Sequence, residues 1–253
     1  MLDVLVDAVT GDEAQRRIVA WARDRESRSV CFCNVHSAVT AHRDPAFREV
    51  VNGADLVVAD GAPVAWAMRR LGHPGQERIA GPDAMLQLCA LAAEEGIGVF
   101  LYGSTGETLR DLQAQLLAAF PRLRLAGAIA PPFQPLTAAE DADVCQRINA
   151  SGAGLVFVGL GCPKQERWMA EHRGRIPSVT LGVGAAFDFH SGRLKRAPGW
   201  LQTLGLEWLH RLLMEPARLW RRYLTANVVF VVGLANQLVR ERAARAASER
   251  SMP

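Results

Sequence analysis

Asp60 is the residue of this 253-residue sequence whose type and setting suit chemistry best. It ends the apolar run ADLVVAD (54–60), and Gly61 permits a tight turn directly after it. A carboxylate there would face a ligand crevice, and partial burial would raise its pKa enough to let it take a proton from an attacking hydroxyl. The alternative is structural, because an aspartate shortly before Pro63 also fits the start of a helix.

A second candidate is the segment VGLGCPKQERWM (158–169), which has the pattern of a strand, a glycine turn and a helix. Free backbone N–H groups at such a helix start form an anion site that suits a diphosphate. The third glycine of a dinucleotide fingerprint is missing, and a plain turn fits equally well. The residues of interest are Gly159, Gly161, Lys164, Gln165 and Glu166, of which Gln165 and Glu166 could bind a ribose or a sugar.

Two further segments place arginines beside acidic residues. In ERIAGPDAM (77–85), Arg78 could pair with a phosphate as the leaving group gains charge, although an ordinary salt bridge is the commoner role of such an arginine. In GVGAAFDFHSGRLKRAP (182–198), Asp188 follows a glycine-rich strand end. The basic residues of that loop, Arg196 among them, could meet a pyrophosphate.

No metal site is predicted. Asp141 and Asp143 match the DxD pattern by which many enzymes hold a metal ion, but they lie two apart in a polar helical segment and are expected to form a solvated face. The six histidines show no HxxxH or HExxH spacing. The five cysteines are expected to be small buried residues in a reducing compartment.

These candidates need a frame of alternating strands and helices. Six short apolar runs recur up to residue 188, and amphipathic helical patterns separate most of them. This pattern predicts an α/β fold, with a Rossmann-like, mostly parallel sheet and helices on both faces. Ligands bind at the carboxyl ends of the strands in such sheets, where Asp60, Gly61, Gly103, Gly159 and Gly161 are expected. The runs are 29–34, 54–60, 98–103, 123–130, 154–161 and 178–188.

The C-terminal part has a different character. Residues 193–250 carry a charge of +7, whereas the rest of the chain carries −4, which suggests that this end meets an anionic partner. The 17 uncharged residues 223–239 would form a helix of about 25 Å, slightly short for a bilayer, so a buried or interfacial helix is favoured. We therefore divide the chain into a catalytic domain, 1–195, and a helical appendage, 196–253.

Together these segments resemble the WecG/TagA/CpsF family of glycosyltransferases, from about residue 30 to 225. The matching pieces are Asn34, ADLVVADG, RIAGPD, GLGCPKQE, GVGAAFDFHSG and RAPGWLQTLGLEWLHRLLMEPARLWRRY. The resemblance implies an inverting transfer from a UDP-sugar to a polyprenyl-diphosphate-linked saccharide in cell-surface polysaccharide synthesis. It also implies a Rossmann-like domain with a C-terminal appendage that aids membrane attachment.

The resemblance assigns roles to four residues. Asp60 becomes the general base, Arg78 a phosphate contact, Asn34 an acceptor or sugar contact, and Gln165 a donor contact. One departure is Phe32, where many relatives have threonine, so that its hydroxyl is absent here or is supplied by a neighbour such as Ser37. No cofactor is required by this prediction, although Mg²⁺ could assist.

The basic appendage is expected to bind the membrane or the diphosphate of the acceptor through Arg211, Arg218, Arg221 and Arg222. A solvated helix face is the alternative. The opening segment lacks a basic leader, so we expect a cytoplasmic protein that is attached peripherally to the inner face of the cell membrane. We also hypothesise that the apolar tail packs on a second subunit in solution, which would give a homo-oligomer.

Three rival functions differ in kind. A nucleotide-cofactor oxidoreductase would need the missing glycine and an acidic ribose partner about 20 residues later. A membrane-associated scaffold gives no reason for Asp60, Arg78 and Gln165. Nucleic-acid binding is not expected, because the basic residues of the tail alternate with Trp and Leu and the main body is acidic.

Overall fold

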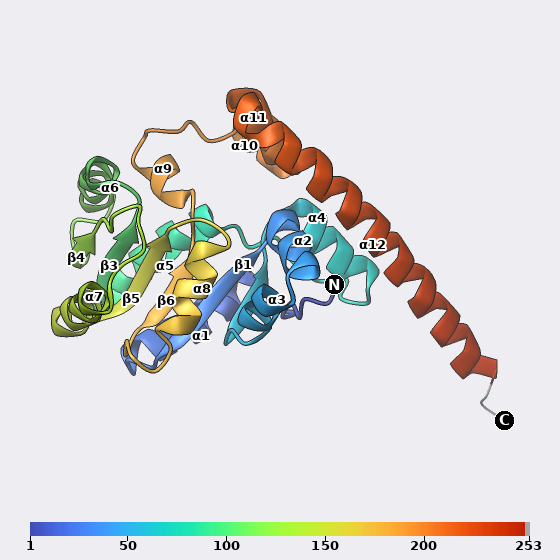
Figure 1. Ribbon diagram of the computed structural model, residues 1–253, viewed down its shortest axis with the longest axis horizontal. Helices are drawn as coiled ribbons and strands as arrows, with labels where there is room; N and C mark the ends of the chain where they lie inside the picture. The colour runs from blue at the N-terminus through green and yellow to red at the C-terminus, as the bar shows by residue number, and fades with distance from the viewer. Residues whose placement is uncertain (251–253) are drawn as a thin grey trace.

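The computed structural model describes residues 1–250, together with their side chains except at 218, 221–223 and 241–250. Within this range, strands form one parallel sheet in the order β2-β1-β6-β5-β3-β4 (Figure 1). Each of the six apolar runs overlaps one strand, so the predicted α/β fold is confirmed and the sheet is parallel throughout. The strands are β1 (Arg28–Cys33), β2 (Leu56–Ala59), β3 (Gly98–Gly103), β4 (Arg124–Ile129), β5 (Ala153–Gly159) and β6 (Val179–Gly182).

Successive residues of each strand enter two different hydrophobic cores, because side chains alternate across a strand. On β1, Cys31 and Cys33 pack into one core, whereas Val30 and Phe32 pack into the other. Helices cover both faces, as the sequence predicts. One layer holds α1 (Gly11–Arg23), α5 (Gly81–Glu95), α6 (Gly106–Ala119) and α9 (Ala186–His190), and the other holds α2 (Val35–Arg43), α3 (Pro45–Asn52), α4 (Ala62–Arg70), α7 (Ala138–Ser151) and α8 (Lys164–Glu171).

Side-chain caps explain where several helices begin. Thr10 accepts a hydrogen bond from the backbone N–H of Glu13 at 3.2 Å and so caps the start of α1. The helix ends at Arg23, and it cannot continue through Arg25, which adopts a positive φ of 53°. Thr137 and Glu140 form a reciprocal capping box at the start of α7.

The C-terminal segment forms α10 (Gly199–Thr203), α11 (Glu207–Met214) and the long α12 (Pro216–Arg250). Figure 1 shows α12 running past one edge of the body, where it packs against α2. Ala226, Phe230 and Leu234 of α12 join the core on that side, and Gly233 lies against Leu2. Among the described residues, no helix has both the length and the apolar character that crossing a bilayer requires.

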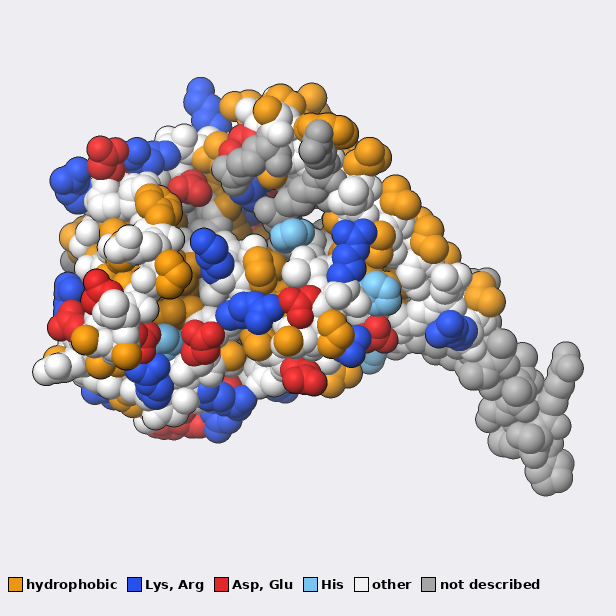
Figure 2. Space-filling view, viewed as in Figure 1, with side chains coloured by type: hydrophobic (Ala, Val, Ile, Leu, Met, Phe, Trp, Pro, Cys, Tyr) orange, Lys and Arg blue, Asp and Glu red, His pale blue; other side chains and the backbone are white. Residues whose placement is uncertain are grey.

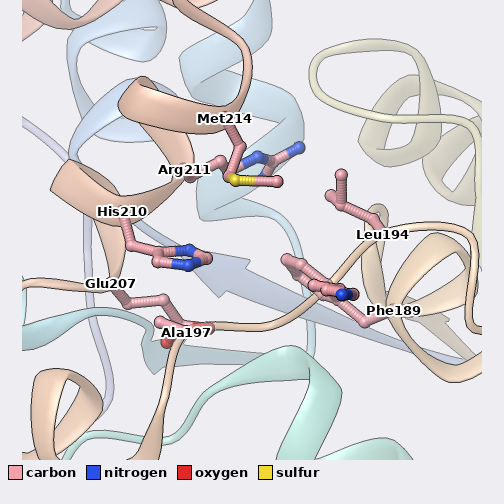
Figure 3. Close-up of a pocket in the computed structure, with 8 residues that line it drawn as sticks. Phe189, Leu194, Ala197, Glu207, His210, Arg211 and Met214 are labelled. Carbon is pink, nitrogen blue, oxygen red and sulfur yellow. The ribbon is translucent and has the colours of Figure 1, made fainter.

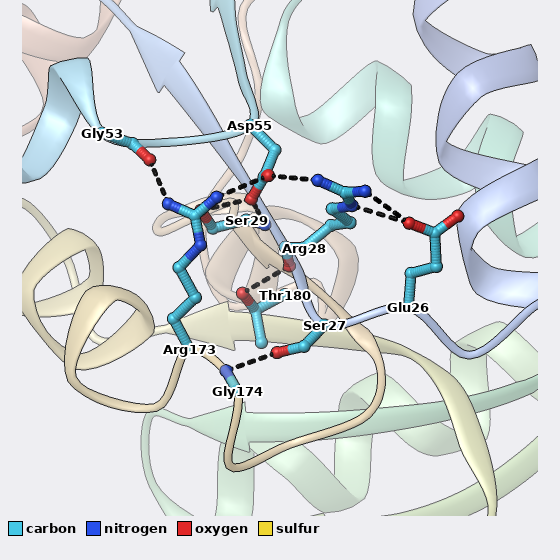
Figure 4. A network of polar contacts seen from close by, with 9 residues as sticks. All are labelled: Glu26, Ser27, Arg28, Ser29, Gly53, Asp55, Arg173, Gly174 and Thr180. Carbon is cyan, nitrogen blue, oxygen red and sulfur yellow. Dashed lines mark hydrogen bonds and ion pairs between the residues drawn. The ribbon is translucent and has the colours of Figure 1, made fainter.

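A network of ion pairs closes the amino-terminal edge of the sheet, opposite to the predicted site (Figure 4). Asp55, just before β2, accepts hydrogen bonds from Arg28 at 2.8 Å, from Arg173 at 2.7 Å and from the backbone N–H of Ser29 at 2.9 Å. Burial alone would raise the pKa of Asp55, but these hydrogen bonds and both arginine charges lower it overall. The network therefore holds an ionised carboxylate at this end of the strand.

The solvated face predicted for the Asp141–Asp143 pair is half wrong. Asp143 is exposed and pairs with Arg147 of the same helix at 3.7 Å. Asp141 instead turns inward, where it meets the buried His172 at 2.8 Å and Arg175 at 2.5 Å. Asp141, Cys145 and His172 thus place three possible metal-ligand atoms within 4.8 Å of one another. The charge of Asp141 is already balanced by Arg175.

Candidate active site

The predicted site residues gather at the carboxyl edge of the sheet, where β1, β2, β3, β5 and β6 end. Asp60 follows β2 and Asn34 follows the neighbouring β1, because these two strands are paired in register. Gly103 ends β3 and Gly159 ends β5. A Cβ on Gly103 would lie 2.6 Å from the backbone of Gly159, so only glycine permits this approach of the two strand ends.

Asn34 links the fold to the candidate base. Its side-chain oxygen caps α2 by accepting hydrogen bonds from His36 at 3.0 Å and Ser37 at 3.2 Å. This cap leaves the amide nitrogen to donate to the Asp60 carboxylate at 3.5 Å. Phe32 stands where many relatives have threonine, and its side chain packs into the other core. The hydroxyl of the neighbouring Ser37 does not replace that of threonine here, because it is bonded to the Asn34 backbone.

Asp60 is partly buried and does not cap the following helix. The helix α4 begins after Gly61, whose φ is 86°, and has no side-chain cap. Burial raises the pKa of Asp60 from 3.8 to about 6, and the nearby charges of Glu207 and Asp83 add to the shift. The Asn34 hydrogen bond and the Arg78 charge oppose it. A carboxylate with this pKa is ionised at neutral pH and is a stronger base than an ordinary aspartate.

Arg78 lines an open cleft of about 350 Å³, a size at the lower end of small-molecule sites. Residues of α4 and of α10 both line this cleft. The cleft therefore lies between the body and the C-terminal helices. The lining residues are Ala62, Ala65, Arg69, Arg78, Gly199, Gln202 and Thr203.

The loop 159–166 is confirmed as a strand, a glycine turn and a helix start, with Lys164 exposed in the first turn of α8. Gln165 is buried, and its amide is engaged by protein groups. The amide nitrogen donates to Gly182 at 2.7 Å and to Glu166 at 2.9 Å, and the oxygen accepts from the N–H of Gly161 at 3.1 Å. Gln165 thus braces the loop against β6 in this structure, and its predicted contact with the donor stays a prediction.

Glu166 and Asp188 lie at the same edge of the sheet, but their side chains are less exposed than expected for residues that contact a ligand. Glu166 is buried, and burial raises the pKa of its carboxyl group. Asp188 lies partly buried in the short α9. Their roles as ligand contacts stay predictions.

Arg211 of α11 lies between the appendage and α9. Its guanidinium lies 5.8 Å from the ring centre of Phe189, and its Nε lies 3.7 Å from Glu215. Figure 3 shows the small hollow beside it, whose volume of about 10 Å³ suits roughly one water molecule. The side chains of Arg218, Arg221 and Arg222 lie outside the described residues.

Two acidic residues at the site were not among the predicted ones. Asp83, in the first turn of α5, accepts hydrogen bonds from two Arg196 nitrogens, one of them at 2.8 Å. Glu207, in the first turn of α11, accepts from Arg78 at 3.0 Å and from Arg196 at 2.9 Å. Asp83 stood in the quoted RIAGPD segment and could have been found there, whereas Glu207 belongs to a helix in which only the basic residue Arg211 was a predicted site residue.

Comparison with known proteins agrees with this arrangement. Residues 1–244 match the model of the glycosyl transferase WecG/TagA/CpsF family. The chain is also similar to the N-acetylglucosaminyldiphosphoundecaprenol N-acetyl-beta-D-mannosaminyltransferase of Bacillus spizizenii, at 34% identity over 197 residues, which cover 78% of this chain and 74% of the relative. The chain is a glycosyltransferase and belongs to the WecG/TagA/CpsF family.

Proposed function

We propose that this enzyme transfers a sugar from a UDP-sugar to a polyprenyl-diphosphate-linked saccharide, with inversion at the anomeric carbon. The observation that carries the proposal is Asp60, a carboxylate of raised pKa at the carboxyl edge of the sheet. It lies close enough to Arg78 for the arginine charge to lower its pKa in part. The name of the Bacillus spizizenii relative supports a lipid-linked acceptor, since it describes an N-acetylglucosaminyl-diphosphoundecaprenol. An N-acetylmannosamine donor is the first one to test on the same ground.

In the proposed reaction Asp60 takes the proton of the acceptor hydroxyl as its oxygen attacks the anomeric carbon. The bond from that carbon to the diphosphate oxygen breaks on the opposite face, and UDP leaves with the bonding electrons. Asn34 holds the carboxylate in place through its amide. Arg78 and the backbone amides of the 159–166 loop would meet the charge that develops on the diphosphate.

The proposal requires no cofactor from the protein. Arg78 offers N–H donors to the donor diphosphate, and Mg²⁺ bound by that diphosphate would add positive charge. The alternative of an oxidoreductase is not supported, because the chain matches a glycosyl transferase family over residues 1–244. A scaffold reading predicts that Asp60→Asn leaves function intact, and the activity assay tests that directly.

We further propose that the C-terminal helices rest on the cytoplasmic face of the membrane. Large apolar side chains on their outer surface are exposed, and Figure 2 shows them gathered along the edge formed by α11 and α12. Such a patch marks a surface that meets a membrane or another protein. Its exposed members are Trp200, Leu204, Trp208, Leu213, Met214, Trp220, Leu224, Val228, Val231, Val232 and Val239.

The activity test supplies the purified protein with a panel of UDP-sugars and a short-chain polyprenyl-diphosphate N-acetylglucosamine. UDP release, product mass and the anomeric configuration by NMR are measured for wild type and Asp60→Asn. We expect acceptor-dependent release of UDP with inversion, reduced by more than about a hundredfold in the variant, the order of magnitude for losing a general base. Full activity of the variant would refute Asp60 as the base, and retention of configuration would refute the direct displacement.

The membrane test compares two substitutions of exposed apolar residues. Leu213→Asp lies on α11, and Phe133→Asp lies in the loop before α7, away from the appendage. We expect the first to weaken co-sedimentation with anionic phosphatidylglycerol vesicles and the second to leave it unchanged. Equal binding by both variants would contradict the proposed surface, and a loss of self-association in the first variant without any vesicle binding would identify a subunit interface instead.

A further inference from the structure

Four charged side chains form a closed ring between the catalytic body and the appendage. Arg78 and Arg196 each contact both Asp83 and Glu207. The Arg78 contacts are 3.5 Å to Asp83 and 3.0 Å to Glu207, and Arg196 lies 2.9 Å from Glu207. Asp83 comes from α5, whereas Glu207 comes from α11, so the ring joins the two parts of the chain.

The two arginines play different parts in the ring. Arg196 directs Nε, Nη1 and Nη2 at carboxylate oxygens, and it is not among the residues that line the cleft. Arg78 lines the cleft and donates one hydrogen bond to Glu207 from Nη1, whereas its Nη2 forms only an ion pair with Asp83, so most of its five N–H donors are not used in the ring. Arg78 is thus held by two carboxylates with donors left for a ligand, and Arg196 balances the charge of those carboxylates.

The ring carries no net charge, because two guanidinium groups face two carboxylates. Any attraction of a diphosphate to Arg78 must therefore come from the direction of its N–H groups, since the ring supplies no excess of positive charge. Arginine binds phosphate best when its planar fork is fixed in advance. Glu207 contributes to this fixation from outside the catalytic body, and only about a quarter of its side chain is exposed.

We propose that Glu207 is a positioning residue for the transfer reaction: it orients Arg78 at the wall of the cleft, and so makes donor binding depend on the docked position of α11. This inference rests on the proposed function, because the ligand of Arg78 is taken to be the donor diphosphate. It explains why the appendage provides an acidic residue at a site that binds an anion. Electrostatic attraction alone would favour a neutral or basic residue at position 207.

Glu207→Gln separates the two explanations, because they predict opposite changes in affinity. Removing one negative charge gives the ring a charge of +1, so that simple attraction predicts tighter binding of UDP. Positioning predicts weaker binding, because Arg78 and Arg196 bond to different oxygens of Glu207, and in glutamine an NH2 group, which cannot accept, replaces one of them. We expect the KM for the UDP-sugar and the Kd for UDP to rise about tenfold, which is the size of one charge-assisted hydrogen bond, with a smaller change in kcat.

Two further variants complete the experiment. Glu207→Asp keeps the charge but shortens the side chain, so we expect an intermediate rise in KM. Glu95→Gln is the matched control, because Glu95 is also a partly buried carboxylate paired with an arginine, Arg23, at 2.6 Å. It lies at the far end of α5, about 18 Å along the helix from Asp83, and its removal should leave KM and Kd unchanged.

UDP binding is measured by calorimetry on the full chain, and thermal unfolding confirms that each variant is folded. Wild-type binding that weakens in Glu207→Gln and partly recovers in Glu207→Asp supports positioning. Equal or tighter binding in Glu207→Gln overturns it and leaves the proposed function standing. A wild-type protein that binds no UDP in the presence of Mg²⁺ overturns the proposed donor and this inference with it.

Discussion

Asp60→Asn should make the protein more stable at neutral pH, although it removes the proposed base. The pKa of Asp60 is raised from 3.8 to about 6 in the folded state, so ionised Asp60 favours the unfolded chain. A difference of about two pKa units corresponds to about 3 kcal/mol, which is an upper limit because Asp60 is only partly buried. Asparagine has the same shape, carries no charge and still accepts the hydrogen bond from Asn34.

The sign of the effect fixes its pH dependence. Below about pH 4 the wild-type carboxyl is protonated in both the folded and the unfolded states, so the variant should gain nothing. Between about pH 4 and 6 the wild type loses stability as the unfolded chain releases its proton first. The gain of the variant should therefore appear across this window and stay constant above it.

Urea unfolding of both proteins at pH 4, 6 and 8 measures the difference. We expect about 2 to 3 kcal/mol in favour of Asp60→Asn at pH 8, with an unchanged slope against urea. A variant that is no more stable than wild type at pH 8 would refute the reasoning, because Asp60 would then have an ordinary pKa. A gain that persists undiminished at pH 4 would point to packing as the cause.

Three other substitutions test separate parts of the structure. Asp55→Asn, at the other end of β2, should lower the free energy of unfolding in urea by about 2 kcal/mol at pH 7, because Arg28 and Arg173 lose their ionised partner. This difference from the wild type should fade in acid, where the wild-type carboxyl also becomes protonated. Asn34→Ser keeps a good helix cap, so the melting temperature should change little, but it removes the amide that donates to Asp60. Because that hydrogen bond lowers the pKa of Asp60, the acid limb of kcat/KM should move to higher pH by up to about one unit. Gly103→Ala should lower both stability and activity, because its Cβ would lie 2.6 Å from the Gly159 backbone and its φ of 127° is unfavourable for alanine. A melting temperature equal to that of the wild type would contradict the close approach of these strands.

The fold could be predicted from the sequence because its signals are local. Strands buried on both faces give short continuous apolar runs, and each of the six runs became a strand. The glycines and Asp60 at their ends follow from the rule that parallel strands present one edge to ligands. The contact between Asp60 and Asn34 was not predicted, because it depends on β1 and β2 being neighbours in the sheet.

The ion pairs could not be predicted because they depend on distant residues. Arg78 and Glu207 are 129 positions apart, and no periodicity connects them. Asp141 looked like part of a solvated helix because its partner His172 comes from the end of another helix, 31 positions away. The charge pattern of a helix shows only which residues of that helix lie near one another. A polar residue that faces inward is therefore predicted to be exposed whenever its partner lies elsewhere in the chain.

The arrangement of α12 shows how one helix can serve both the catalytic body and a membrane. Ala226, Phe230 and Leu234 bury one side of the helix in the core, while Val228 and Val231 remain exposed on another. In our proposal the acceptor sugar is tied to a lipid that stays in the bilayer, so the cleft must be presented at the membrane surface. A helix fixed to the body by one apolar side and resting on lipid by the other does this without crossing the bilayer. Because α10 of the same appendage forms a wall of the cleft, membrane contact and the shape of the donor site are coupled through one continuous segment of chain.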